Sequence, residues 1–174
     1  TTNIASHARV TASNAPVPVQ YWLRALNDGK VRASPLPPDM WATWTPKNPA
    51  RVWVQYQWDT PQTIAAASLW FWADHAAGSG EGVAPPQTWH LEYWNERTWQ
   101  PVTAPSAYGT LVDADNRVAF TPVTTRCLRA VFDASTDGKT FAAVAAQEWR
   151  VDAVAPQAPR HPSATGAASA DCAP

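Results

Sequence analysis

Residues 51–58 read Arg-Val-Trp-Val-Gln-Tyr-Gln-Trp, and this stretch decides the fold class. Every even-numbered position in it is apolar, whereas Gln55 and Gln57 occupy two of the positions between. Successive side chains of a β-strand point to opposite faces of a sheet, so an apolar residue at every second position indicates a strand with one buried face. We therefore expect a β-strand whose even-numbered side chains face the core and whose glutamines face outward.

Three further runs share this alternation, and a fourth has apolar residues on both sides. Residues 89–94, 128–132 and 149–151 carry apolar side chains at every second position. Residues 65–72 are apolar on both sides, which is typical of a central strand covered on both faces. No long segment shows the period of an amphipathic helix. These runs predict a protein built from strands.

Between the runs lie short clusters of Gly, Pro, Asn and Asp, which favour turns and loops. They are Asn27-Asp28-Gly29, Pro35-Leu36-Pro37-Pro38, Gly78-Ser79-Gly80, Pro85-Pro86 and Asp137-Gly138. Strands separated by such loops predict an all-β fold, a jelly-roll β-sandwich with little helix. We assign this domain to residues 1–155, and the Ala/Pro/Ser-rich residues 156–174 to a mobile tail or linker.

Composition narrows the class of ligand. The chain has 174 residues, of which 16% are charged and eleven are tryptophan. This length is enough for one domain with a substantial core. Most of the tryptophans are expected in that core, and a few are expected on the surface as stacking platforms for a flat ligand. The net charge of −1 and the lack of a basic patch argue against nucleic-acid binding. No apolar run approaches the roughly 20 residues that a membrane span needs.

The sequence alone does not decide whether the two cysteines are free thiols or a disulfide. Cys127 lies inside a strand-like run, and Cys172 lies two residues from the end of the chain. Their spacing matches no metal-binding pattern. A disulfide between them is one alternative, but we expect two free thiols. No signal peptide precedes Thr1, so we expect either a mature form or an excised module.

A series of short motifs occurs in a fixed order along the chain. They are Asn3-Ile-Ala-Ser6, Val10-Thr-Ala-Ser13, Ala25-Leu-Asn-Asp-Gly29, Val52-Trp-Val-Gln-Tyr56, Trp58-Asp-Thr-Pro-Gln-Thr63, Leu69-Trp-Phe-Trp72 followed by Asp74, Pro86-Gln-Thr-Trp89, Phe120-Thr-Pro-Val-Thr-Thr125 and Glu148-Trp-Arg-Val151. Together they resemble the discoidin family, also called coagulation factor V/VIII C-type or galactose-binding-like domains. The likeness is strongest to the carbohydrate-binding branch appended to bacterial glycoside hydrolases.

The resemblance also shows where this chain departs from its family. Trp44 fits the family's buried tryptophan position. Ala84 stands where the family often has an Arg, and residues 30–40 are Pro-rich instead of following the usual Ser/Asp pattern. Both departures fall in loops on the ligand side, so we expect altered sugar contacts.

In the discoidin family the Asn27-Asp28-Gly29 turn wraps a structural calcium ion, and the resemblance implies one here. Asp28 supplies a hard carboxylate, and Gly29 lets the backbone curl so that carbonyl oxygens converge. The implied ligands are the carbonyls of Ala25 and Lys30, the carboxylates of Asp28 and Glu148, and the hydroxyl of Ser34. The alternative is an ordinary Asp-Gly turn that binds no metal.

The resemblance further implies a shallow sugar-binding cleft at one end of the sandwich. The corresponding loops are residues 13–24, 30–43, 73–85 and 133–144. A sugar stacks its C–H face on an aromatic ring, and its hydroxyls need donors and acceptors. The candidate side chains of these kinds are Tyr21, Trp22, Arg32, Trp41, Asp74, His75, Glu81 and Phe141. The structural alternatives are Trp22 packed under the first loop, Trp41 in the core, Asp74 capping a turn and Phe141 closing the end of the sandwich.

Catalytic motifs are missing from the sequence. It has no Gly-x-Ser-x-Gly elbow, His-Glu-x-x-His pair or phosphate loop, and neither Glu92 with Glu96 nor Asp113 with Asp115 lies in a setting that would raise a pKa. We therefore predict a non-catalytic carbohydrate-binding module that targets an attached, secreted or periplasmic polysaccharide-degrading enzyme to its glycan. Arabinose-, galactose- and xylose-containing oligosaccharides are the candidate ligands. The alternative is a structural or protein-binding accessory β-sandwich that packs against a catalytic domain and binds no sugar.

Overall fold

The computed structural model describes residues 2–13, 23–33, 39–154 and 171–174. Its elements, in chain order, are β1 (Thr2–Asn3), η1 (Ala5–His7), β2 (Arg9–Ala12), η2 (Leu23–Asn27), β3 (Trp41–Ala42), β4 (Arg51–Trp72), β5 (Thr88–Trp94), β6 (Trp99–Pro101), β7 (Asn116–Asp133) and β8 (Ala145–Ala153), where η marks a short 3₁₀-helix. Strands dominate the described residues, which confirms the predicted all-β class. Among these residues, no helix is long and apolar enough to cross a membrane.

Two long strands, β4 and β7, build the layers of the fold. All named pairings are antiparallel, and the sheet order is β1-β8-β4-β7-β5-β6, with β2 beside β4 and β3 beside β8. Residues 51–57 of β4 pair with residues 127–133 of β7, most of which also pair with β5, and residues 54–57 pair with β2. Residues 64–72 of β4 pair with β8, and residues 62–69 also pair with residues 116–125 of β7.

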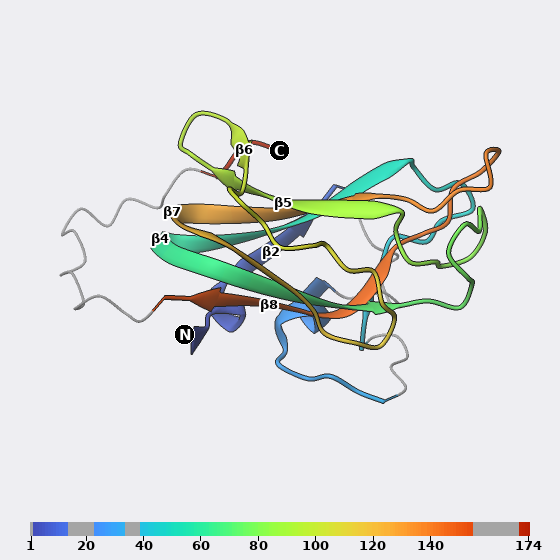
Figure 1. The fold of residues 1–174 in the computed structure, drawn as a ribbon, viewed down its shortest axis with the longest axis horizontal. Helices are drawn as coiled ribbons and strands as arrows, with labels where there is room; N and C mark the ends of the chain where they lie inside the picture. The colour runs from blue at the N-terminus through green and yellow to red at the C-terminus, as the bar shows by residue number, and fades with distance from the viewer. Residues whose placement is uncertain (1, 14–22, 34–38, 155–170) are drawn as a thin grey trace.

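The long strands bend where their register is interrupted. In β4 the register shifts between Gln57 and Gln62 and again between Ile64 and Ala66. Such irregularities bend a strand and increase its twist. The sheet therefore curls over on itself into a β-sandwich, as Figure 1 shows, and the predicted jelly-roll sandwich is confirmed.

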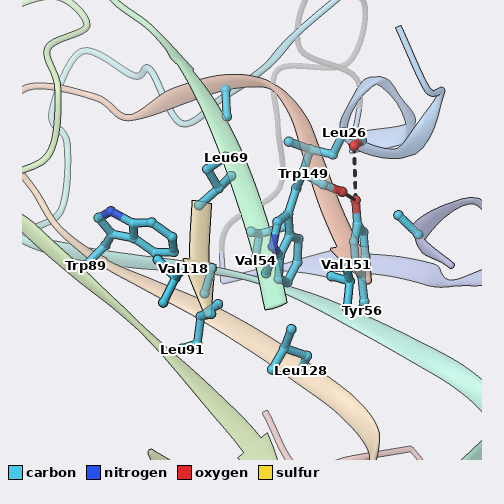
Figure 2. Packing of buried hydrophobic residues seen from close by; sticks show 14 of the residues in the cluster. Leu26, Val54, Tyr56, Leu69, Trp89, Leu91, Val118, Leu128, Trp149 and Val151 are labelled. Atoms are coloured by element: carbon cyan, nitrogen blue, oxygen red, sulfur yellow. Dashed lines mark hydrogen bonds between the residues drawn. The ribbon is translucent and has the colours of Figure 1, made fainter. Parts of the chain in front are cut away.

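The core between the layers is rich in aromatic rings. As the alternation predicted, the even-numbered side chains of residues 52–58 are buried. Tyr56 stacks on Trp149 of β8 with 4.0 Å between the ring centroids. The Tyr56 hydroxyl lies 3.1 Å from the carbonyl oxygen of Leu26 and 2.8 Å from that of Trp149 (Figure 2). This ring pair joins β4 and β8 across the core and ties η2 to both.

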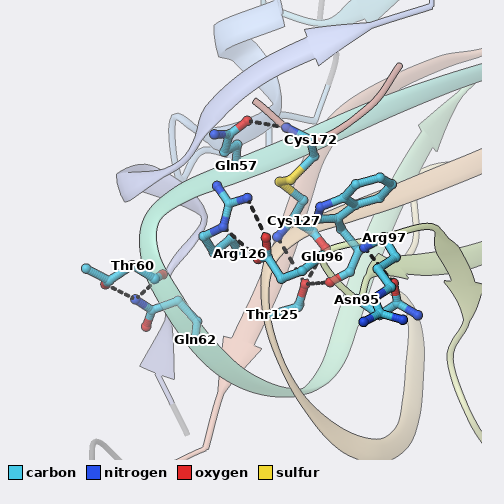
Figure 3. Close-up of polar contacts among 11 residues, drawn as sticks. Gln57, Thr60, Gln62, Asn95, Glu96, Arg97, Thr125, Arg126, Cys127 and Cys172 are labelled. Carbon is cyan, nitrogen blue, oxygen red and sulfur yellow. Dashed lines mark hydrogen bonds and ion pairs between the residues drawn. A yellow bond between two sulfur atoms is a disulfide. The ribbon is translucent and has the colours of Figure 1, made fainter. Parts of the chain in front are cut away.

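The C-terminal residues 171–174 do not behave as a linker. Cys172 forms a disulfide with Cys127 of β7, so the expectation of two free thiols is wrong (Figure 3). Arg9 of β2 pairs with Asp171 at 2.6 Å, which holds the segment from a second side. The earlier part of the predicted tail lies outside the described residues.

This attachment also explains why two glutamines differ from their predicted exposure. Gln55 and Gln57 were expected to face solvent, but they are only 5% and 8% exposed. The Arg129 guanidinium covers Gln55 and donates to its Oε1 at 2.7 Å. The Gln57 Oε1 accepts the backbone N–H of Cys172 at 3.4 Å. Their face of the sheet is therefore buried by side chains and by the C-terminal segment.

Candidate functional site

A hollow of about 610 Å³ opens at one end of the sandwich, where three loops meet. The loops are residues 44–50, before β4; residues 80–82, between β4 and β5; and residues 139–141, between β7 and β8. These segments gather at the right-hand end of the molecule in Figure 1. A concave site with an apolar lining and a few polar groups is the usual form of a small-molecule binding site.

Hydrogen bonds join the three loops to one another. The Asn48 side-chain amide donates to the Phe141 carbonyl at 3.1 Å, which connects the first loop to the third. The Thr140 hydroxyl donates to the Gly80 carbonyl at 2.8 Å, which connects the third to the second. Contacts of this kind hold the cavity wall in a defined shape before any ligand arrives, which lowers the cost of binding.

Two glycines allow the loops to approach this closely. A Cβ at Gly80 would lie 2.6 Å from the Asp137 carboxylate. Gly82 has a φ of +63° and a Cβ there would lie 2.2 Å from Nδ1 of His75. Both distances are shorter than any real Cβ contact, so a side chain at Gly80 would push the second and third loops apart, and one at Gly82 would displace His75 within the connection between β4 and β5.

Trp44 is the largest aromatic side chain in the cavity wall. Its exposed fraction is 39%, and Pro46, Pro49 and Phe141 line the same hollow. The sequence placed Trp44 in the core and Trp41 at the ligand, and the structure reverses the two. Trp41 is 0% exposed and packs against Phe132 with 5.9 Å between ring centroids. A fully buried ring cannot stack on a sugar, so the predicted ligand contact at Trp41 is wrong.

The remaining predicted ligand residues fall into three groups. Glu81 and Phe141 line the cavity. Asp74 and His75 lie outside its lining and pack against Gly82, with the His75 Nδ1 2.7 Å from an Asp74 oxygen that also accepts the Val83 N–H at 2.9 Å. Partial burial acts to raise the pKa of Asp74, but the hydrogen bonds from His75 and the Val83 N–H outweigh it and lower that pKa.

The third group lies away from the cavity or outside the described residues. Arg32 pairs with Asp28 and Asp39, each at 3.4 Å, and is absent from the cavity lining. Tyr21 and Trp22 lie outside the described residues. Sequence reasoning missed the loop 44–50, although a tryptophan followed by two prolines, a lysine and an asparagine between two strands was the available signal.

The overall geometry has counterparts among solved structures, although no protein-family sequence model matches the chain. A chain of the Streptococcus pneumoniae β-galactosidase BgaA matches with a TM-score of 0.66 and 19% identity, over 86% of this chain and 97% of that one. The Clostridium perfringens module CpGH89CBM32-5, in complex with GalNAc-β-1,3-galactose, matches with a TM-score of 0.59 and 13% identity over 86% and 99%. The family 32 carbohydrate-binding module of S. pneumoniae EndoD matches with a TM-score of 0.56 and 16% identity over 87% and 99%.

This chain has the fold of a carbohydrate-binding module. The discoidin-like architecture that the sequence motifs implied is thereby confirmed. The agreement spans almost the full length of each of these three matching chains.

The Asn27-Asp28-Gly29 turn brings two carboxylates together. The Lys30 N–H donates to Oδ1 of Asp28 at 2.8 Å and to Oε2 of Glu148 at 3.0 Å. Gly29 has a φ of +76°, the conformation that lets the turn curl. Burial, and then the neighbouring Asp28 carboxylate, raise the pKa of Glu148 to about 8.

The donor set of this turn fits a hard cation. Glu148 Oε1 is buried and has no hydrogen-bond partner among the described residues. The Asp28 N–H lies 3.5 Å from the Ala25 carbonyl oxygen, so that carbonyl faces the same turn. No three His, Cys, Asp or Glu side chains cluster within the described part of the chain, so further ligands would be backbone carbonyls or water, which calcium accepts. Ser34, the last implied ligand, lies outside the described residues.

Proposed function

We propose that the chain is a non-catalytic carbohydrate-binding module that holds an attached polysaccharide-degrading enzyme at its glycan. The observation that carries the proposal is the hollow at the loop end, with the Trp44 ring exposed in its wall. The fold of the chain is that of modules solved with a sugar or appended to glycoside hydrolases, which supports the same role. Tethering would raise the local concentration of substrate around the catalytic domain.

The chemistry of the cavity suits a sugar. The Trp44 ring offers a flat apolar face for the C–H side of a pyranose, and Phe141 adds a second ring. The polar side chains beside them, Asn48, Thr140 and Glu81, provide donors and acceptors for hydroxyls. An open cavity buries only part of such a ligand, so we expect a Kd on the order of 10 μM to 1 mM, equivalent to about 4–7 kcal/mol.

Titration of the isolated module with galactose-, arabinose- and xylose-containing oligosaccharides tests the proposal. Ligand-induced NMR shifts should concentrate on residues 44–50, 80–82 and 139–141. Trp44→Ala should lower affinity roughly five- to thirtyfold, since loss of one stacking ring costs about 1–2 kcal/mol. Trp94→Ala, at the far end of β5, is the matched control and should bind like the parent. If no glycan shifts these loops, the alternative of a structural accessory sandwich is favoured.

We also propose that calcium binds at the Asp28 turn as a structural ion. Support comes from the orphaned Glu148 oxygen and from the two carboxylates that share the Lys30 N–H. An oxygen-ligated cation there would favour the ionised form of Glu148, whose pKa burial and the neighbouring Asp28 otherwise raise.

Secretion to the cell exterior or the periplasm is part of the same proposal. The disulfide between Cys127 and Cys172 is buried on both sides, with both cysteines at most 5% exposed. Structural disulfides of this kind persist in oxidising compartments and are rare in the cytosol. The polysaccharides that such a module would meet lie in those compartments.

A further inference from the structure

The mouth of the Trp44 cavity carries more positive than negative charge. Lys47 lies in its first loop, Lys139 in its third and Glu81 in its second, and all three are exposed. Within the described residues, none of the three takes part in an ion pair. Their charges are therefore available to a ligand.

The other acidic groups near the cavity are not among the residues that line it. Asp137 accepts the backbone N–H groups of Lys139 and Thr140 at 2.8 and 3.0 Å. Asp74 pairs with His75 behind Gly82. Asp133 pairs with Arg51 at 2.9 Å.

Both lysines project from turns whose backbone is fixed. The Lys47 carbonyl accepts the Thr45 hydroxyl at 2.7 Å, and the Thr45 N–H is bound by Asn48 at 2.8 Å. Lys139 follows Gly138, which has a φ of +91°, in the turn closed by Asp137. Side chains that start from fixed backbone lose less freedom on binding than side chains on a mobile loop.

We propose that this cavity selects glycans that carry carboxylates, that is, chains containing uronic acids. This inference rests on the proposed function, because it names the class of sugar for the same site. The Trp44 ring stacks on the pyranose, Glu81 accepts hydroxyl hydrogens, and the ammonium groups of Lys47 and Lys139 pair with the sugar carboxylates.

The size of the effect follows from the exposure of these pairs. A solvent-exposed ion pair contributes about 0.2–1 kcal/mol and weakens as salt screens it. Each lysine should therefore change affinity only about 1.4- to fivefold. The stacking ring decides whether a glycan binds at all, and the lysines decide which glycan binds better.

The test compares an oligogalacturonide with its own methyl ester, two ligands of one backbone that differ in charge. The free acid should bind more tightly than the ester at low salt, and the ratio should fall as salt is added. Lys47→Gln and Lys139→Gln should each weaken binding of the acid about 1.4- to fivefold and leave binding of the ester unchanged. Lys139→Arg should retain the preference, and Arg97→Gln, which removes an exposed positive charge from the turn between β5 and β6, should have no effect.

The outcomes separate the two proposals. If acid and ester bind equally and Trp44→Ala weakens both, the cavity is a glycan site without charge selectivity and this inference is overturned. Stronger binding of a chitosan oligomer, the cationic probe, would overturn it as well. If no glycan of any charge shifts the cavity loops, the proposed function itself fails, and the charge inference fails with it.

Discussion

Cys172 is joined to Cys127 by a disulfide that spans 45 positions of sequence and closes the C-terminal segment onto strand β7 (Figure 3). The next residue continues the contact. The Ala173 carbonyl accepts hydrogen bonds from Nε1 of Trp99 and from the Arg129 guanidinium, both at 2.9 Å. A segment that reads as a linker in the sequence is therefore part of the packed domain.

The surface under this segment is a stacked arrangement of one cation and two rings. The Arg129 guanidinium lies 3.9 Å from the ring centroid of Trp53 and 4.0 Å from that of Trp99. Burial lowers the pKa of Arg129 to about 10, so it keeps its charge at neutral pH. Cation–π contacts and hydrogen bonds to Gln55 replace the water that a buried guanidinium loses.

The first prediction concerns this disulfide. Cys172→Ser should lower the free energy of unfolding by about 2–4 kcal/mol, because the cross-link restricts a long loop of the unfolded chain. Urea unfolding monitored by tryptophan fluorescence measures the loss. Reductant should destabilise the parent by a similar amount and leave the variant unaffected. Equal stability of parent and variant in the absence of reductant would mean that the segment contributes nothing to the fold.

The second prediction concerns pH and calcium at Glu148. Without metal, its pKa is about 8 in the folded state, against an ordinary value of 4.5. The folded state therefore binds more protons than the unfolded state between these two values, and stability falls as pH rises through that range. Calcium should hold the carboxylate ionised and remove this loss, because it binds only the native turn.

Melting temperatures at pH 5 and pH 8, with chelator and with calcium, measure both effects. In chelator the protein should melt lower at pH 8 than at pH 5. Glu148→Gln should remove that difference and also the response to calcium. A melting curve at pH 8 that is the same with calcium and with chelator would contradict the proposal that calcium binds at this turn.

The third prediction contrasts two tryptophans three positions apart. Trp41→Ala should destabilise the fold by about 3–5 kcal/mol, because it empties a large volume in the core. Trp44→Ala should change stability by less than about 1 kcal/mol, since its ring is partly exposed in the cavity wall. Thermal unfolding of the two variants side by side checks the contrast. Comparable losses would mean that Trp44 is a core residue, as its sequence position first suggested.

The fourth prediction concerns the close contact between the second loop and His75. Gly82→Ala combines an unfavourable φ of +63° with a clash against the His75 ring, so it should destabilise by more than about 1 kcal/mol and weaken glycan binding. Gly138→Ala is the matched control, because Gly138 also has a positive φ but meets nothing within 4 Å. Adding His75→Ala to Gly82→Ala should recover part of the loss. If the two glycine variants behave alike, only backbone strain matters and the contact is unimportant.

The local alternation of side chains was enough to predict the sandwich. The buried face of residues 52–58 follows from the period of two, because that period is a property of the extended backbone itself. The central position of residues 65–72 follows from their apolar side chains on both faces. The turn at Asp28 was also predictable, since Asn, Asp and Gly all favour turns. These features depend only on residues that are close together in the sequence, so the sequence is enough to predict them.

The site depends on contacts between residues that are distant in sequence. Only the tertiary structure decided which of these residues meet. Trp41 and Trp44 lie in the same short stretch, and which ring enters the core depends on how β3 pairs with β8. Gln55 and Gln57 lie on the outward face, as their alternation requires, yet they are buried because Arg129 and a segment more than a hundred positions away cover them. Three loops that are remote in sequence make one cavity because the bends in β4 and β7 carry their ends to the same edge of the sandwich.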